Sequence, residues 1–247
     1  MRLLAVKTHR AHRRLSNSLY LLLTLGALSL AACQNAPTAQ STSSIVQPLP
    51  SLPVANSTRY LISEDESDIR FLVYRDGPFG FLGHNHVVQA KHFTGEIYLA
   101  PEFNDSGFSL NLPVDKFVID ASEARASEGP DFSKQPSESD VAETREHMLG
   151  PDALDAADYP DIHIRSVNLE RTGNSSVVTV RIDFHGVTRD LTVPIAIEQL
   201  DDRIVVTGEF QLKQTDYSIK PFSFLGGAIR VADIVNVHFK IVGLKGA

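Results

Sequence analysis

Hydrophobic and polar residues alternate along most of the chain beyond residue 59. In residues 206–213 and 235–241, apolar side chains take almost every second position and polar residues fill the positions between. A period of two places the apolar side chains on one face of an extended strand, which is typical of a half-buried antiparallel sheet. The predicted strands are 60–63, 68–75, 87–90, 93–99, 108–119, 162–169, 177–184, 191–197, 204–213 and 234–242.

The strands of the second half are joined by short turns. Gly173, Gly186 and the pair Asp201-Asp202 mark three of them. Evenly spaced strands with short turns predict one meandering antiparallel sheet that closes on itself rather than a βαβ fold. We therefore predict an all-β domain over residues 59–247, built as a β-barrel with an apolar interior.

Residues 120–154 interrupt the alternation. Residues 127–140 are polar and rich in Gly, Pro and Ser, which predicts an exposed loop. Residues 139–149 begin with a capping residue and acids and are followed by Gly150-Pro151, the start and stop signals of a helix. The barrel is thus expected to carry a short helical insertion.

The N-terminal segment has the features of an export signal. Residues 1–18 carry five basic residues and no acid, and residues 19–30 form an apolar to small-residue run too short for a permanent transmembrane helix. The run ends in Leu30-Ala31-Ala32-Cys33, which contains the only Cys of the chain and resembles the lipobox of bacterial lipoproteins. We expect residues 1–32 to be a lipoprotein signal peptide and Cys33 to be lipidated; the alternatives are a plain secretory peptide or a short signal anchor.

Residues 33–58 are predicted to form a lipidated Cys and a flexible tether. After Cys33 this segment is uncharged and rich in Ser, Thr, Ala, Pro and Gln, so it cannot bury enough apolar surface to offset its ordering entropy. The expected location is the bacterial periplasm, with the protein held to a membrane by its lipid. Gln34, in place of the Asp that often retains lipoproteins at the inner membrane, favours the outer membrane.

The charge balance excludes some partners. Without residues 1–32, 18 of the 23 basic residues and all 30 acidic residues remain, which gives a formal net charge of −12. Such a charge argues against nucleic acid as a partner and against electrostatic adhesion to anionic lipid. Membrane attachment must then come from the acyl chains, at about 0.8 kcal/mol per buried CH₂ group.

Four short motifs follow one another in the second half of the chain: residues 145–149 (REHML), 154–162 (LDAADYPDI), 184–191 (FHGVTRDL) and 210–217 (FQLKQTDY). With these motifs in this order, residues 60–243 resemble the YceI-like (lipid/polyisoprenoid-binding) family of bacterial periplasmic proteins. The resemblance implies a lipocalin-like antiparallel barrel of about eight strands with a helical insertion, a long apolar tunnel, and an isoprenoid or other long amphiphile as ligand. The chain departs from simple family members in its lipobox and in its longer polar insertion at residues 127–140.

The apolar faces of the strands supply the candidate ligand-binding residues. An eight-stranded barrel either fills itself with side chains or holds one slender ligand, so a solid core is the alternative to a tunnel. The predicted interior residues, with Met148 of the predicted helix, are Phe71, Val73, Phe93, Ile97, Leu110, Leu112, Ile162, Ile164, Val180, Ile182, Phe184, Val193, Ile195, Phe210, Leu212, Val237 and Phe239.

Two Gly-rich corners carry large apolar residues that a packed core would not need. One contains Phe79, Phe81 and Leu82, and the other contains Phe222, Phe224 and Leu225. We interpret them as a movable entrance to the tunnel. Burying a C15–C40 chain behind it would be favourable by roughly 25 cal/mol per Å² of apolar surface.

His84 and His86 form the sharpest polar feature. Residues two apart on an extended backbone point the same way, so the pair could share a metal ion, a haem or a ligand head group, with His147 or His163 as a third partner. The alternative, which we favour over metal or haem, is a head-group contact or hydrogen bonding within the loop.

Catalytic motifs are not found in the sequence. It has no G-x-S-x-G elbow, phosphate-binding loop or dinucleotide fingerprint. We therefore expect a carrier of a long apolar molecule, without a cofactor, rather than an enzyme. Two other hypotheses remain: a metal- or haem-dependent redox module built on His84 and His86, and a ligand-free structural domain whose Gly/Phe corners contact a membrane partner.

Overall fold

The computed structural model describes residue 52 and residues 54–173 and 175–246. The predicted signal peptide, Cys33 and most of the predicted tether lie outside these residues. The strands are β1 (Thr58–Ile62), β2 (Asp68–Asp76), β3 (His86–Gln89), β4 (Thr94–Leu99), β5 (Gly107–Pro113), β6 (Val118–Ile119), β7 (Asp161–Thr172), β8 (Ser175–Phe184), β9 (Val187–Gln199), β10 (Arg203–Lys213), β11 (Ser223–Phe224) and β12 (Ile229–Lys245), and the helices are α1 (Ser122–Ser127) and α2 (Glu138–Leu149).

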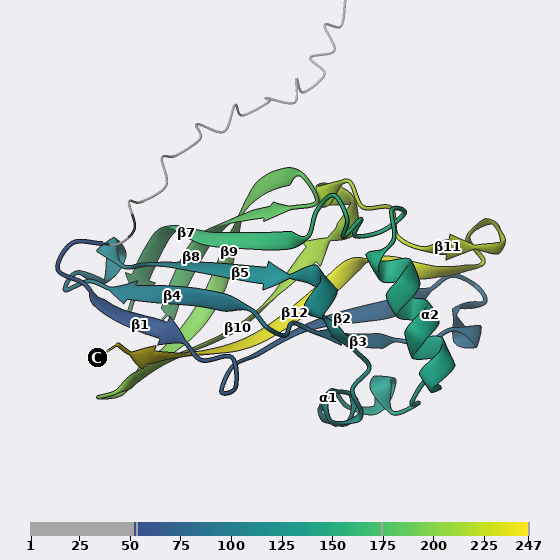
Figure 1. Ribbon diagram of the computed structural model, residues 1–247, viewed down its shortest axis with the longest axis horizontal. Helices are drawn as coiled ribbons and strands as arrows, with labels where there is room; N and C mark the ends of the chain where they lie inside the picture. The colour runs from purple at the N-terminus through teal and green to yellow at the C-terminus, as the bar shows by residue number, and fades with distance from the viewer. Residues whose placement is uncertain (1–51, 53, 174, 247) are drawn as a thin grey trace, which may run out of the picture. The chain divides into compact units, whose positions relative to one another are not determined.

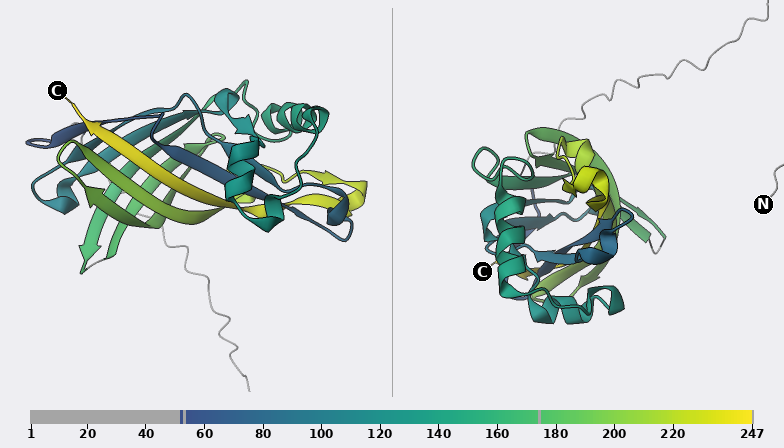
Figure 2. Two further views of the ribbon diagram at one scale, coloured as in Figure 1. Left: turned by 90° about the horizontal axis from the view of Figure 1, so that it is seen from below. Right: turned by 90° about the vertical axis from the view of Figure 1, so that its right-hand side faces the viewer.

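Eight strands close into an antiparallel barrel, which confirms the predicted fold. The order around the ring is β1-β4-β5-β7-β8-β9-β10-β12, and β12 returns to β1 through the pairs Tyr60↔Lys245 and Ile62↔Gly243. Figure 1 shows the ring from the side, and the right-hand view of Figure 2 shows it nearly end-on. Closure removes the free sheet edges that would otherwise invite pairing with another chain.

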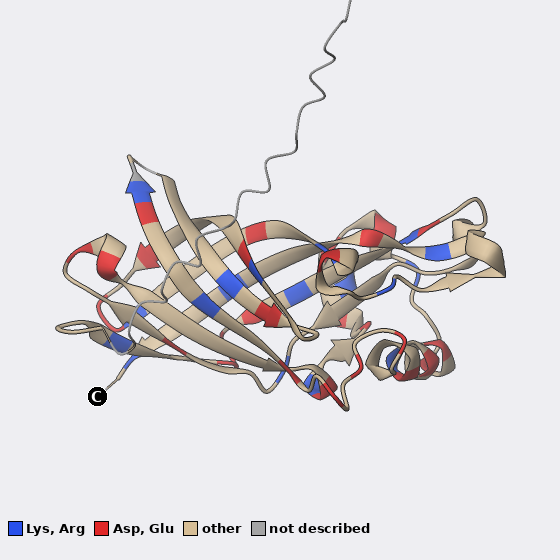
Figure 3. Ribbon diagram, turned by 90° about the horizontal axis from the view of Figure 1, so that it is seen from above, with Lys and Arg blue, Asp and Glu red and all other residues tan. Residues whose placement is uncertain are grey.

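A smaller sheet extends the barrel at one end. The N-terminal part of β12 pairs with β2, from Arg230↔Asp76 to Lys240↔Asp68, and β3 and β6 continue from β2. Both helices and β11 lie at this end (Figure 1). The outer faces carry the charged residues (Figure 3), as in the ion pair between Arg181 Nε and Asp190 Oδ1 at 2.7 Å on the neighbouring strands β8 and β9.

The predicted strand 108–119 is wrong as a single element. β5 ends at Pro113, a 3₁₀ turn covers Val114–Lys116, and the short β6 follows. The backbone N–H of Val114 donates to Pro160 O at 2.9 Å, so the chain leaves the ladder at this turn. A proline has no N–H to continue a ladder, and Pro113 marks the strand's end.

The prediction of an exposed loop at residues 127–140 is also wrong in part. Within this range α1 ends at Ser127, a 3₁₀ turn covers Pro130–Phe132 and α2 begins at Glu138, and Phe132 is buried. Its ring meets the edge of Tyr74, with 5.3 Å between centroids, and it clusters with Leu72, Val87 and Ala124. One aromatic residue in a polar segment thus fastens the insertion to the small sheet.

The predicted helix at 139–149 is confirmed and begins one residue earlier. Ser137 caps α2: its side chain accepts the Asp140 N–H, and Asp140 accepts the Ser137 N–H in return. This reciprocal pair satisfies two backbone donors that a helix start leaves free. Within the described part of the chain, no helix is both long and apolar enough to cross a bilayer.

Candidate ligand-binding cavity

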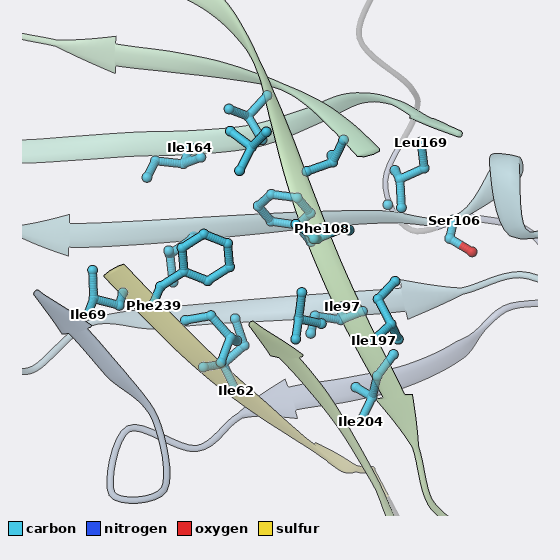
Figure 4. A pocket seen from close by; sticks show the side chains of 18 of the residues that line it. Ile62, Ile69, Ile97, Ser106, Phe108, Ile164, Leu169, Ile197, Ile204 and Phe239 are labelled. Atoms are coloured by element: carbon cyan, nitrogen blue, oxygen red, sulfur yellow. The ribbon is translucent and has the colours of Figure 1, made fainter. Parts of the chain in front are cut away.

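The barrel encloses an apolar cavity of about 130 Å³ (Figure 4). Every strand of the ring contributes to its wall, together with β2 and the connection between β4 and β5. The lining residues are Ile62, Ile69, Phe71, Ile97, Leu99, Phe103, Ser106, Gly107, Phe108, Leu110, Leu112, Ile164, Leu169, Val178, Val180, Ile182, Val193, Ile195, Ile197, Ile204, Val206, Phe210, Val237, Phe239 and Ile241.

The wall offers almost nothing to which water could hydrogen-bond. Ser106 is its one polar side chain, and the Ser106 hydroxyl already accepts the Ala100 N–H at 3.0 Å. The described lining includes no acid, base or histidine. Cavities with such walls stay dry and take up apolar molecules, so the chemistry of this cavity favours hydrocarbon.

Twelve of the residues predicted from strand alternation line the cavity. They are Phe71, Ile97, Leu110, Leu112, Ile164, Val180, Ile182, Val193, Ile195, Phe210, Val237 and Phe239. The other predicted interior residues, Val73, Phe93, Ile162, Phe184 and Leu212, belong to the packed core outside the cavity wall, and Met148 of α2 packs against that core.

Toward the helices the barrel interior is solid. The Phe71 ring stacks on Phe117 with 5.4 Å between the ring centroids, and the ring centroids of Phe184 and Tyr217 are 5.3 Å apart. Phe117 and Tyr217 are both buried, as is Ile219 beside them in the same core. Both sequence-based alternatives therefore apply, each to one part of the barrel: the interior is packed toward the helices, and the cavity lies beyond it.

At its other end the cavity reaches the connection between β4 and β5. Phe103 lies in a 3₁₀ turn there (Phe103–Asp105) and lines the cavity, and the Arg171 guanidinium sits 4.1 Å from the centre of its ring. The chain entering β1 passes the same place, because a Cβ added to Gly107 would meet Leu52 Cδ2 at 3.0 Å. Phe103, Arg171 and the chain entering β1 thus lie together at this end of the cavity.

The predicted entrance residues lie elsewhere. Phe79, Phe81, Leu82, Phe222 and Phe224 are all exposed and do not line the cavity. Their loops project beyond the solid end of the barrel (Figure 1), so the filled interior separates them from the hollow. Contact between these residues and a ligand stays a prediction.

Thirteen lining residues were missed in the sequence. Most of them lie within the predicted strands and continue their alternation, as Phe108 does for Leu110 and Leu112, so the same rule applied along the whole of each predicted strand would have found them. Phe103 had no such signal, because it lies in a turn where no periodicity applies.

The histidines do not gather into a metal site within the described residues, where no group of three or more His, Cys, Asp or Glu is placed to hold an ion. The ring centroids of His84 and His86 are 6.3 Å apart. His147 lies elsewhere, with its ring centroid 5.6 Å from that of Phe222, and His163 lies on β7 opposite Asp183. Burial, and to a lesser degree the charge of Lys134, lowers the pKa of His84.

His86 is held by a buried carboxylate. Its Nδ1 lies 2.7 Å from Asp120 Oδ2, while Asp120 Oδ1 accepts the Val87 N–H at 2.9 Å and pairs with Arg125. Burial alone would raise the pKa of Asp120, but the hydrogen bonds from His86, Val87 and Arg125 outweigh it and hold that pKa below its ordinary value.

Arg125 completes the network around the same segment. Its guanidinium is buried and donates to Asn85 O at 2.7 Å and to Lys134 O at 2.6 Å. The side chain of Asn85 in turn accepts from Arg75 N and donates to Asp131 O, each at 3.0 Å. The residues around His86 thus tie the helical insertion to β3, which accounts for this polar cluster structurally.

Comparison with known proteins supplies the family. The model of the YceI-like domain matches residues 60–243. No curated protein is similar enough in sequence to be matched.

Solved structures agree with the fold. The structure of BcnA from Burkholderia cenocepacia is 17% identical, covers 73% of this chain and 98% of its own, and superposes with a TM-score of 0.56. A polyisoprenoid binding domain from Saccharophagus degradans is 12% identical, with coverage of 76% and 98% and a TM-score of 0.50.

These identities show a shared barrel rather than a shared ligand. The family model, however, spans almost the whole barrel, from β1 to the last residues of β12. The chain belongs to the YceI-like family.

Proposed function

We propose that this chain is a membrane-tethered periplasmic carrier that binds a long apolar molecule, of isoprenoid or similar lipid type, inside its barrel. The observation that carries the proposal is the enclosed cavity, whose wall is apolar on every strand of the ring. The similar barrel from Saccharophagus degradans is described as a polyisoprenoid binding domain, which supports the same class of ligand here.

The size of the cavity adds a condition. Pockets for drug-sized ligands usually measure about 300–1,000 Å³, and this one measures about 130 Å³. A long chain therefore requires the wall to move, either by rotamer changes of its Phe, Ile and Leu side chains or by opening at Phe103. The lining has no partner for a polar head group, so we place the head outside the barrel near Arg171 and the tail inside.

Binding rather than catalysis fits this site. Among the described residues that line the cavity, none has a titratable side chain that could transfer a proton, and general acid–base chemistry needs such a group within hydrogen-bonding reach. The paired His86 and Asp120 lie instead among the contacts that hold the helical insertion.

The direct test is extraction of the protein, purified from its own host, with organic solvent, followed by mass spectrometry. We expect a long-chain apolar molecule in about equal amount to the protein. As a matched pair, Val180→Phe places a ring in the cavity and Val118→Phe adds the same ring at an exposed position. Recovery of the molecule from the Val118 variant and not from the Val180 variant supports the cavity; repeated absence from the natural protein overturns the proposal.

The tether is tested separately. Mass spectrometry of the mature N-terminus should find an acylated Cys33, and Cys33→Ser should release the protein from the membrane fraction. Unmodified Cys33 would remove the anchor and leave the cavity proposal untouched.

A further inference from the structure

Six large apolar side chains are exposed together at the helix end of the barrel. They lie on two loops, which we call the tips: residues 77–83 between β2 and β3, and residues 220–228 around β11. The side chains are Phe79, Phe81, Leu82, Phe222, Phe224 and Leu225, and each is 48–64% exposed.

The two tips form one unit. Phe79 N–H donates to Ala228 O at 2.8 Å, and Arg230 Nε pairs with Asp76 Oδ2 at 2.7 Å across the strands that carry the loops. Gly77, with φ of +91°, permits this approach, since a Cβ there would lie 2.6 Å from Ala228 O. The two loops are therefore joined at their bases rather than independent of each other.

The tips are not needed by the barrel core. The interior behind them is filled by other side chains, among them Phe117, Phe184 and Tyr217. Large apolar groups gathered on a protein surface usually mark an interaction site. Apolar side chains on projecting loops are suited to insertion at the boundary between lipid head groups and acyl chains.

The charge of the tips differs in sign from that of the domain. The tips themselves contain one charged residue, Lys220. With the strand ends that carry them, residues 75–83 and 219–231 contain three basic residues and one acid, which gives +2 by residue count, on a mature chain of net −12. The one acid, Asp76, is paired with Arg230, and Lys220 is exposed beside Phe222. In Figure 3 the outermost parts of both loops are free of charged residues. An apolar tip with basic residues behind it complements an anionic lipid surface.

We propose that the tips dock on a phospholipid bilayer, with their Phe and Leu side chains inserted and Lys220 near the phosphates. The length of the chain before the barrel permits this orientation. From Cys33 to Val54 the chain has 21 peptide steps and an extended reach of at most about 75 Å, whereas β12, with its 17 residues, spans about 55 Å. An anchor at Cys33 therefore allows the far end of the barrel to reach the same membrane.

The proposal does not depend on a ligand in the cavity, and its test uses none. The chain from residue 33 with Cys33→Ser, which lacks acyl chains and includes every described element, is sedimented with vesicles of phosphatidylethanolamine and phosphatidylglycerol. The tip variant carries Phe81→Ser and Phe224→Ser. The control carries Leu61→Ser and Leu200→Ser, two exposed residues on β1 and in the β9–β10 turn, away from the tips.

We expect the tip variant to lose about tenfold or more in vesicle partitioning while the control stays within about twofold of the parent. Neutral phosphatidylcholine vesicles should bind the parent more weakly than anionic ones, because of Lys220 and its basic neighbours. Equal binding by parent and tip variant overturns the proposal, as does no binding by the parent. Sedimentation velocity tests whether the surface is instead a contact between two copies of the chain. If the parent is a dimer that does not bind vesicles, and the tip variant is a monomer, docking on lipid is overturned.

Discussion

The ring of Phe239 lies against Gly208, the residue opposite it across β10 and β12. The two residues are paired in the sheet register, and a Cβ at position 208 would come within 2.6 Å of Phe239 Cζ and 2.8 Å of Pro194 O. Because glycine leaves this space free, the ring can lie close to the sheet and form part of the cavity wall. The position of the Phe239 ring in the cavity wall thus depends on glycine at position 208.

Gly208→Ala tests this relation. The new methyl group must displace the Phe239 ring, since the Pro194 carbonyl belongs to the neighbouring strand and cannot move freely. Overpacking of this kind costs about 1–3 kcal/mol, and the displaced ring should also lower the affinity for a fluorescent fatty-acid probe. Urea unfolding and probe titration measure the two effects. Gly83→Ala is the control, because a Cβ there meets no atom closer than 3.5 Å; equal stability of the two variants would contradict the prediction.

Asp120→Asn is expected to destabilise the fold by about 3 kcal/mol. The substitution removes the carboxylate that pairs with buried Arg125 and leaves that guanidinium without its counter-charge. Urea unfolding at pH 7 measures the loss. Asp131→Asn is the matched control, since the Asp131 side chain is exposed and its carbonyl, which serves Asn85, is unchanged.

The same variant gives a pH dependence with a defined sign. The pKa of Asp120 is lower in the folded than in the unfolded protein, so its contribution is complete above the ordinary Asp pKa, about 4, and is lost as the pH falls through the lower folded value. The difference between natural protein and variant should therefore shrink below pH 4. A difference that is the same at pH 7 and pH 3 would contradict this role of Asp120.

Arg171→Gln should speed ligand exchange. The guanidinium covers the Phe103 ring at the end of the cavity away from the helices, and an exposed cation–π contact contributes about 0.5–1 kcal/mol. If the turn that carries Phe103 must lift for the ligand to leave, removal of this contact raises the release rate about two- to fivefold. Stopped-flow release of a fluorescent fatty acid measures this rate. Lys213→Gln, at an exposed position on β10, should leave it unchanged, and an equal change in both would place the exit elsewhere.

The closed barrel could be predicted from the sequence because strand alternation is local. A residue such as Leu110 shows its face through its neighbours two positions away, and that pattern holds whatever the strand pairs with. Helix α2 could be predicted for the same reason, because its start and stop signals are local; its cap is Ser137, however, two residues before the Ser139 that was predicted to begin the helix. The burial of Phe132 could not be predicted from the sequence, because its partners Leu72 and Val87 are far away along the chain.

The position of the hollow along the barrel could not be predicted either. Phe184 and Val193 alternate alike in their strands, yet the first packs in the core against Tyr217 and the second lines the cavity. Which of them meets a partner across the barrel depends on the side chains of several strands together. Alternation gives the inward face of each strand, but it does not say whether opposite faces touch.

Tyr217→Phe should protect the protein against alkali. Burial at the solid end of the barrel raises the pKa of Tyr217 to about 12, whereas an unfolded chain releases that proton near pH 10. Between these values the unfolded state has lost a proton that the folded state keeps, so the free energy of unfolding of the natural protein falls as the pH rises from 10 to 12. The decline attributable to this residue is at most about 1.4 kcal/mol per pH unit, and a phenylalanine has no proton to lose. Urea unfolding of both proteins at pH 8 and pH 11 measures this decline. The free energy of unfolding of the variant relative to the natural protein should rise from pH 8 to pH 11. An equal change in both proteins would mean that the hydroxyl ionises in the folded barrel as readily as in the unfolded chain.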